Sequence, residues 1–148
     1  MNIRLLCFGK VKDKRLKSLV EEYERRLAHH NTRFSVIEWG DVDLGRQQDR
    51  IRTFLENHPE STVFLLDDQG KTMSTEQFAS TLGKVKDSGG NAVFILGDAH
   101  GFGEEFKKGF SHRFSLSPMT FPHEVARLLL TEQLYRVVTL WNHIPYHK

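Results

Sequence analysis

The feature that most constrains the fold is a regular alternation of strand-like and helix-like segments along the whole chain. Strand-like segments, either apolar runs or alternating stretches, at 2–8, 33–39, 61–66, 91–96 and 112–117 alternate with segments of helical periodicity at 13–27, 47–57, 74–86, 104–109 and 122–141. Strands that alternate with helices form a parallel sheet that is covered by helices on both faces. The sequence therefore predicts an α/β fold with a mostly parallel sheet flanked by helices. Residues 67–71 are expected to form a turn after the third strand.

The size and composition of the chain predict one domain that spans residues 1–148. Its 148 residues carry no repeat, low-complexity tract or linker, and 39% of them are hydrophobic. No apolar run reaches the roughly 18 residues that a membrane span needs. The chain begins without the pattern of a signal peptide, and its lone cysteine, Cys7, excludes an internal disulfide. We therefore expect a cytoplasmic protein with no membrane partner, in which Cys7 is a buried small apolar residue.

The charge distribution suggests a contact with phosphate. The net charge is only +2. However, Lys10, Lys12, Lys14, Arg15 and Lys17 gather at one turn and the start of the helix that follows it. Such a cluster is typical either of a surface that meets nucleic-acid phosphates or of a solvated helix start.

Three loops follow the ends of predicted buried strands. In open parallel sheets, ligands bind beyond the carboxyl ends of the strands. The loops are residues 65–71, the glycine-rich loop 97–103 and the hydroxyl-rich loop 115–123. Residues 97–103 have the spacing G-x-x-x-G-x-G, which is neither a dinucleotide fingerprint nor a phosphate-binding P-loop. This loop suits either a close backbone approach to a small flat ligand or a set of tight turns.

The loop at 115–123 predicts an adenosyl ligand that lacks phosphates. It is uncharged up to residue 122 and rich in hydroxyl groups, so its backbone can bind an adenine edge. The side chains of Leu116, Met119 and Phe121 can cover the faces of the ring. No cluster of cations is present to hold a multiply charged phosphate, which argues against ATP or NAD as the ligand.

The last helix is apolar around most of its circumference, which predicts burial on more than one side, including contact with another subunit. Its polar residues include His123 and Arg127, four residues apart on one face, and the favourable pair Glu132 and Arg136. After it, the chain ends in Tyr146-His147-Lys148. A tyrosine can stack on a base, and lysine or histidine can meet phosphate, although a solvated tail is an equal alternative.

Several of these segments together resemble a known family. They are the segment 115–123, Arg127, the run Glu132-Gln133-Leu134-Tyr135-Arg136, the ending Pro145-Tyr146-His147-Lys148, the stretch 66–71 and the opening Gly9-Lys10-Val11-Lys12. The chain is similar over its whole length to the ribosomal RNA large subunit methyltransferase H family of the SPOUT class. This resemblance implies methylation of N3 of a pseudouridine in 23S rRNA, with S-adenosylmethionine as cofactor.

The resemblance also implies a fold and a set of site residues. It implies a trefoil knot in the C-terminal half and a homodimer whose cofactor pocket lies near the subunit interface. The implied cofactor-binding residues are Leu66, Gly97, Leu116, Ser117, Pro118, Met119, Thr120 and Phe121. Asp98 is a departure, because the family usually has a second glycine there. Its carboxylate is expected to reshape the pocket, attract the sulfonium or point to solvent.

The remaining site residues are assigned by the chemistry of the reaction. N3 of the base carries a proton that must leave, so a general base is required, and His123 or His147 is expected to serve. Arg127 or Arg136 is expected to hold a phosphate or the deprotonated base, and Tyr146 to stack on the base. No metal site and no DNA partner are expected. The alternatives are a non-catalytic RNA- or ribosome-binding protein on a degenerate fold, which Asp98 would support, and a methyltransferase for another RNA or a small molecule.

Overall fold

A computed structural model describes residues 1–98 and 100–148; Ala99, part of the predicted glycine-rich loop, lies outside them. In the described residues, five parallel strands form one sheet in the order β2-β1-β4-β3-β5. The strands are β1 (Asn2–Phe8), β2 (Arg33–Trp39), β3 (Ser61–Thr72), β4 (Asn91–Leu96) and β5 (His112–Ser115). The predicted α/β fold with a parallel sheet is confirmed.

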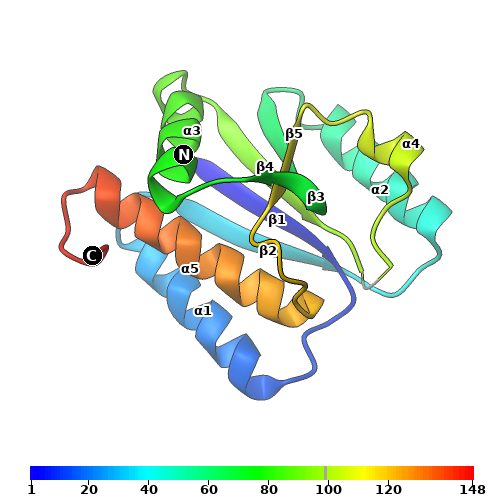
Figure 1. Cartoon of the computed structure of the whole chain (residues 1–148), viewed down its shortest axis with the longest axis horizontal. Helices are drawn as coiled ribbons and strands as arrows, with labels where there is room; N and C mark the ends of the chain where they lie inside the picture. The colour runs from blue at the N-terminus through cyan, green and yellow to red at the C-terminus, as the bar shows by residue number, and fades with distance from the viewer. Residues whose placement is uncertain (99) are drawn as a thin grey trace.

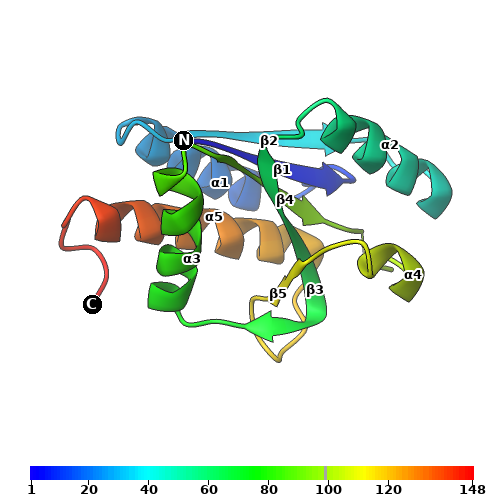
Figure 2. The same ribbon diagram turned by 90° about the horizontal axis from the view of Figure 1, so that it is seen from above.

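Helices cover both faces of this sheet (Figures 1 and 2). One face carries α1 (Lys14–Ala28), α3 (Thr75–Asp87) and α5 (His123–Trp141), and the other carries α2 (Leu44–Glu56) and the short α4 (Glu104–Lys107). The side chains of neighbouring strand residues point to opposite faces. Phe64 and Phe94 stack in the core under α3 and α5, whereas Leu65 and Ile95 pack towards α2.

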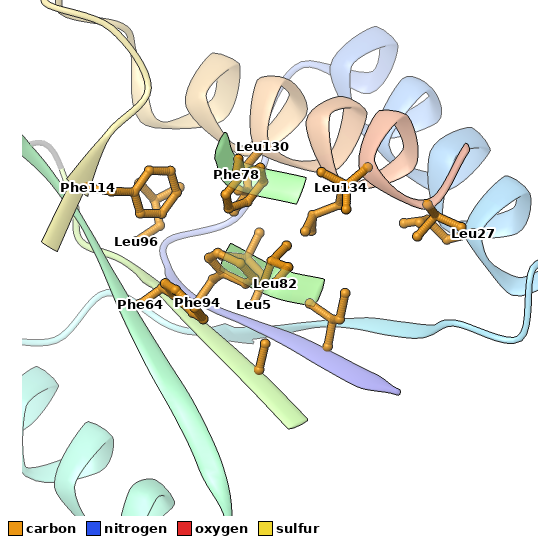
Figure 3. Packing of buried hydrophobic residues seen from close by; sticks show 14 of the residues in the cluster. Leu5, Leu27, Phe64, Phe78, Leu82, Phe94, Leu96, Phe114, Leu130 and Leu134 are labelled. Carbon is orange, nitrogen blue, oxygen red and sulfur yellow. The ribbon is translucent and has the colours of Figure 1, made fainter. Parts of the chain in front are cut away.

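The larger core lies between the sheet and the layer of α1, α3 and α5 (Figure 3). Leu130 and Leu134 of α5 are fully buried there, together with Leu82 of α3 and Leu27 of α1. The helix α5 is therefore enclosed on two sides by α1 and α3 and on a third by the sheet. This explains most of the apolar circumference seen in its sequence without a second subunit.

Side-chain caps set the helix starts. The predicted capping box opens α3: Ser74 accepts from the N–H of Gln77, and the Gln77 side chain accepts from the N–H of Ser74. The start of α2 was predicted three residues too late. It begins at Leu44 because the Asp43 carboxylate accepts a hydrogen bond from the N–H of Arg46.

The expectation of a turn at residues 67–71 is wrong, because β3 continues to Thr72. The pairing with β5 shifts inside this stretch, since Leu66 and Lys71 are both partners of Phe114. The intervening residues bulge out of the ladder. Gly70 permits the close approach, because a Cβ there would lie 2.6 Å from the backbone of Phe114. Polar residues and a glycine mark a strand irregularity here rather than a strand end.

The carboxyl ends of the strands meet at one edge of the sheet. The loops after β1, β4 and β5 all begin there. The chain leaves β1 towards β2, on one side, and leaves β4 for β5, on the other. Two adjacent strands from which the chain departs in opposite directions form a crevice that commonly binds ligands.

The C-terminal knot remains a prediction. Among the described helices, none has the length and apolar character required to cross a membrane.

Candidate functional site

Two adjoining pockets lie at the carboxyl edge of the sheet, between the bulge of β3 and the start of α5. The walls that they share are Leu66, Asp67, Asp68, Leu96, Thr120, Phe121 and Ala126. One pocket extends along the loop 115–121 and has a volume of about 490 Å³. The other extends below the loop 97–102 and reaches His123, with a volume of about 930 Å³ including its open mouth. The three loops predicted to bind a ligand therefore converge.

Most of the residues expected to bind a cofactor line these pockets. Seven of them do so: Leu66, Gly97, Leu116, Ser117, Met119, Thr120 and Phe121. Pro118 belongs to the same loop but is not part of either wall. Met119 is 73% exposed, so the pocket has a large apolar side chain at its mouth that nothing else in the described chain covers.

The loop after β5 is folded by its own serines. Ser115 Oγ donates to the Ser117 carbonyl at 2.7 Å and accepts from the Ser117 N–H at 3.3 Å. Ser117 Oγ accepts from the N–H of Met119 at 3.0 Å. Such local hydrogen bonds replace the strand ladder and end β5 at Ser115, two residues earlier than predicted. The hydroxyl groups that suggested ligand contacts thus also build the loop.

The glycine-rich loop is folded tightly against itself. A Cβ on Gly97 would lie 3.0 Å from the Phe102 ring and 3.3 Å from the Cα of Gly101. Gly101 has a φ of +63°, in the left-handed region that glycine adopts without strain. A side chain at position 97 would therefore require Phe102, which packs against Phe8, and the backbone of Gly101 to shift by a few tenths of an ångström. This crowding explains why glycine is needed at Gly97.

Asp98 is held in place rather than free in solvent. Its Oδ2 accepts from Gln47 Nε2 at 2.7 Å, and its Oδ1 accepts from the N–H of His100 at 2.9 Å. Gln47 is buried on α2 and also donates to the Val42 carbonyl. Asp98 thus joins the loop to α2. Of the three expectations for Asp98, the one in which its carboxylate simply points to solvent is wrong.

A buried carboxylate that sequence reasoning missed lies in the shared wall. Only 1% of the Asp67 side chain is exposed. It accepts from Lys107 Nζ at 2.9 Å and from Arg113 Nε and Nη2 at 2.8 and 2.6 Å. Burial alone would raise the pKa of Asp67, but the hydrogen bonds from Lys107 and Arg113 outweigh it and lower the pKa to about 2. Asp67 therefore fixes α4 and β5 against β3.

Lys107 and Arg113 also contact Glu104, at 3.2 and 3.5 Å, so these four residues form one network of alternating charge. The sequence carried a weak indication of it. An aspartate that directly follows a buried apolar run is costly to bury without a cation, and the two cations that pair with Asp67 come 40 and 46 residues later in the chain. Nothing in the sequence indicates that these two cations are the partners of Asp67.

His123 and Arg127 share a face of α5, as predicted, but lie at different depths. His123 is half-buried at the pocket, and a Cβ placed on Gly9 would lie 4.0 Å from its Nε2. Arg127 is only 2% exposed. Its Nη1 is paired with Glu38 of β2, and its Nη2 donates to the Gly9 carbonyl at 3.3 Å. In this conformation Arg127 joins α5 to β1 and β2.

The other expected catalytic residues lie in the second half of α5 and in the tail that follows it. Glu132 accepts hydrogen bonds from Arg136 at 2.6 Å and from the Tyr146 hydroxyl at 3.1 Å. Arg136 also lies over the Tyr146 ring, 4.8 Å from its centroid. His147 Nε2 is 2.8 Å from Glu76 of α3. The tail is therefore bound to its own protomer, beside Glu132 and Arg136, which follow His123 by 9 and 13 residues of α5, or about 14 and 20 Å along the helix axis.

The Tyr146 hydroxyl is partly shielded from solvent. Burial is the main cause that raises its pKa, and the hydroxyl of Tyr23, 3.3 Å away, and the charge of Glu132 add to it. The phenol therefore stays protonated at neutral pH and can donate a hydrogen bond.

Comparisons with known proteins agree with this geometry. A family model described as "Predicted SPOUT methyltransferase" matches residues 1–147. The chain is 38% identical to a protein of Porphyromonas gingivalis named ribosomal RNA large subunit methyltransferase H, over 99% of both chains. It is 35% identical to the protein of that name from Gemmatimonas aurantiaca, over the full length of both.

Solved structures share the fold. A methylase family protein from Neisseria gonorrhoeae superposes with a TM-score of 0.57 at 10% identity, over 91% of this chain and 82% of that one. A methyltransferase from Legionella pneumophila, solved in complex with bound SAM, superposes with a TM-score of 0.54 at 13% identity, over 95% of this chain and 66% of that one.

Proposed function

Since this chain belongs to the SPOUT methyltransferase family, and within it to the ribosomal RNA large subunit methyltransferase H proteins, we propose that it methylates ribosomal RNA of the large subunit. The proposed reaction transfers a methyl group from S-adenosylmethionine to N3 of a pseudouridine in 23S rRNA. The observation that carries the proposal is the convergence of the loops after β4 and β5 with the bulge of β3 around one pocket at the carboxyl edge.

The residues present fit S-adenosylmethionine. Leu66, Leu96 and Phe121 supply apolar walls for a flat ring, and the close packing around Gly97 leaves a backbone surface with no side chain on it. The one lysine of the two pockets, Lys107, is already paired with Asp67 and Glu104. No free cation in these walls is available for a phosphate, which favours an adenosyl group over a nucleotide. When bound, the cofactor supplies an activated methyl group.

The proposed work of the protein is positioning and proton removal. Loops 97–103 and 115–121 hold the cofactor, and the target base enters beside His123, because this imidazole lines the pocket next to Gly9. His123 takes the N3 proton, either directly or through water. Asp98, with both oxygens engaged, orients the loop after β4.

Residues of the tail complete the site from a second copy of the chain. We propose a homodimer, because Tyr146 and Arg136 are bound at Glu132, about 14 Å along α5 from His123, and so do not reach the same base as His123 within one protomer. In the partner's site, Tyr146 stacks on the base, Arg136 or His147 contacts phosphate, and His147 is the alternative base. Arg127 is proposed to act from the protein interior: its hydrogen bond to the Gly9 carbonyl positions the loop that lies beside His123.

The whole chain is proposed to act as one SPOUT domain, knotted in its C-terminal half, because one sheet carries every strand of the described residues. An rRNA substrate places the reaction in the cytoplasm. Asp98 no longer favours a degenerate, non-catalytic fold, because it stabilises the loop that carries Gly97.

The test is methyl transfer to large ribosomal subunits from a strain that lacks this gene, with digestion of the rRNA and mass spectrometry of its nucleosides. We expect one new methylated pseudouridine per subunit. Binding of subunits without any transfer of methyl from the cofactor would instead support a non-catalytic ribosome-binding protein, and methylation of another nucleotide or of tRNA would support a different RNA substrate.

A further inference from the structure

The loop between β1 and α1, residues 9–13, is bound at both ends to the helix that carries His123. Arg127 Nη2 donates to the Gly9 carbonyl at 3.3 Å. The Glu124 carboxylate accepts from the N–H groups of Lys12 and Asp13 at 3.0 and 3.4 Å. These hydrogen bonds, from Lys12 above all, lower the pKa of Glu124. The loop is therefore held in place next to His123, which lines the pocket.

Three lysines in or next to this loop are exposed and have no acidic partner among the described residues. In residues 1–98 and 100–148, no carboxylate lies within 4 Å of the amines of Lys10, Lys12 or Lys14. Some exposed cations elsewhere are paired, such as Arg46 with Asp43 and Lys108 with Glu105, whereas others, such as Arg25 and Lys84, have no acidic partner among the described residues. Lys10, Lys12 and Lys14 differ from these because three such cations lie within five residues of the chain, in and next to a loop that is bound to the start of α5.

The stability of α1 does not explain this concentration. The first turn of a helix carries a partial positive charge, so acidic side chains stabilise it and basic ones destabilise it, by about 0.3–1 kcal/mol each. The first turn of α1 has no acidic residue and begins with Lys14 and Arg15. Only Asp13, at the cap, opposes them, and Arg15 already pairs with it at 2.8 Å. The chain keeps lysines where the helix alone would favour carboxylates.

We propose that Lys10, Lys12 and Lys14 form a docking surface for the phosphate backbone of the rRNA strand that carries the target base. This inference rests on the proposed function. Lysine amines contact phosphate as point charges, and this contact carries affinity rather than sequence specificity. Because Glu124 and Arg127 hold the loop to the same helix as His123, the surface positions the strand relative to the methyl-transfer site.

The test compares two triple variants with the same loss of charge. The first is K10Q/K12Q/K14Q. The control is R25Q/R33Q/K84Q, whose residues are exposed at the last turn of α1, the start of β2 and the last turn of α3, at the opposite edge of the sheet. Affinity for unmodified large subunits is measured from 50 to 200 mM salt. We expect the slope of log K against log salt to become less negative by about 2 to 3 for the first variant, and its binding to be about tenfold weaker or more. The control should keep the wild-type slope within about 1.

Binding of S-adenosylmethionine, measured by calorimetry, should be unchanged in both variants, which shows that they are folded. Equal slopes for the two triple variants would overturn the inference while leaving the proposed function intact, provided that the wild type methylates the subunits. A loss of affinity for subunits but not for protein-free 23S rRNA would place a ribosomal protein on this surface, and would also overturn it. A wild type that neither binds nor methylates subunits would refute both.

Discussion

At the scale of single residues, Asp67 is the group on which the pocket wall depends. Its carboxylate replaces the water that it loses on burial with three hydrogen bonds from two cations. Removing one partner of a buried ion pair is costly, because the remaining charges keep their desolvation penalty. The same side chain joins three elements that are far apart in the sequence: β3, α4 and β5.

We expect Asp67→Asn to lower the free energy of unfolding at pH 7 by about 2 kcal/mol or more, and to weaken cofactor binding through the displaced wall. The folded-state pKa of Asp67, about 2, lies below its unfolded value near 3.8. Its contribution to stability is therefore present above about pH 4 and is lost as the pH falls towards 2. Urea denaturation between pH 7 and 3 measures both effects.

The matched control is Asp68→Asn, because Asp68 is exposed and has no ion-pair partner in the described chain. It should change the unfolding free energy by less than about 0.5 kcal/mol. Two results together would contradict this role of Asp67: equal unfolding free energies for the Asp67 and Asp68 variants at pH 7, and a loss of stability in acid for the Asp67 variant equal to that of the wild type. The Asp67 carboxylate would then not hold the pocket wall.

At the scale of elements, local patterns predicted most of the fold. The strands 2–8, 33–39 and 91–96 have the predicted bounds, because each is a short apolar or alternating segment that is followed directly by a glycine. The capping box placed α3 for the same local reason. The bulge at 67–70 was not predictable, because it depends on the approach of β5, more than 40 residues later, to Gly70.

The site was predictable in part, and the part that was not predictable again depends on contacts between residues far apart in the sequence. Glycines and hydroxyls next to strand ends identified the pocket loops, since strand ends gather at one edge of a parallel sheet. The partners of these loops did not follow, because Gln47 and Asp98 are 51 residues apart and Glu124 and Lys12 are 112 apart. Long-range hydrogen bonds between exposed residue types leave no periodic pattern.

Glu124 provides a test of how firmly the loop 9–13 is held to α5. We expect Glu124→Ala to accelerate hydrogen exchange at the amides of Lys12 and Asp13 by about tenfold or more, because both lose their acceptor. Exchange monitored by mass spectrometry or NMR measures this. The Michaelis constant for large subunits should rise, while the affinity for S-adenosylmethionine stays the same.

Glu105→Ala on α4 is the control, since Glu105 is exposed and contacts only Lys108 among the described side chains. It should leave the exchange of both amides at the wild-type rate. Unchanged protection of Lys12 and Asp13 in the Glu124 variant would mean that the loop is held by other contacts, and that Glu124 does not position it.

At the scale of the whole molecule, the two groups of proposed catalytic residues lie apart along one helix. His123 begins α5, and Tyr146 is bound by Glu132 at its middle and by Arg136 one turn further on. A rigid helix that is packed against α1, α3 and the sheet keeps His123 and Glu132 about 14 Å apart along its axis. If both groups act in one reaction, the tail must serve the pocket of another protomer, and a two-fold symmetric dimer is the simplest assembly that allows it.

This arrangement predicts that two inactive variants restore each other. His123→Ala should lose methyl transfer, and so should a chain that ends at Ile144, although both should still bind S-adenosylmethionine. After subunit exchange in a 1:1 mixture, half of the dimers contain one chain of each kind. Within such a dimer, the truncated chain keeps His123 and receives the intact tail of its partner, so one of the two sites is complete. The mixture should therefore recover about one quarter of the wild-type rate. If the tail served the pocket of its own protomer, no site in any mixed dimer would be complete and the mixture would stay inactive.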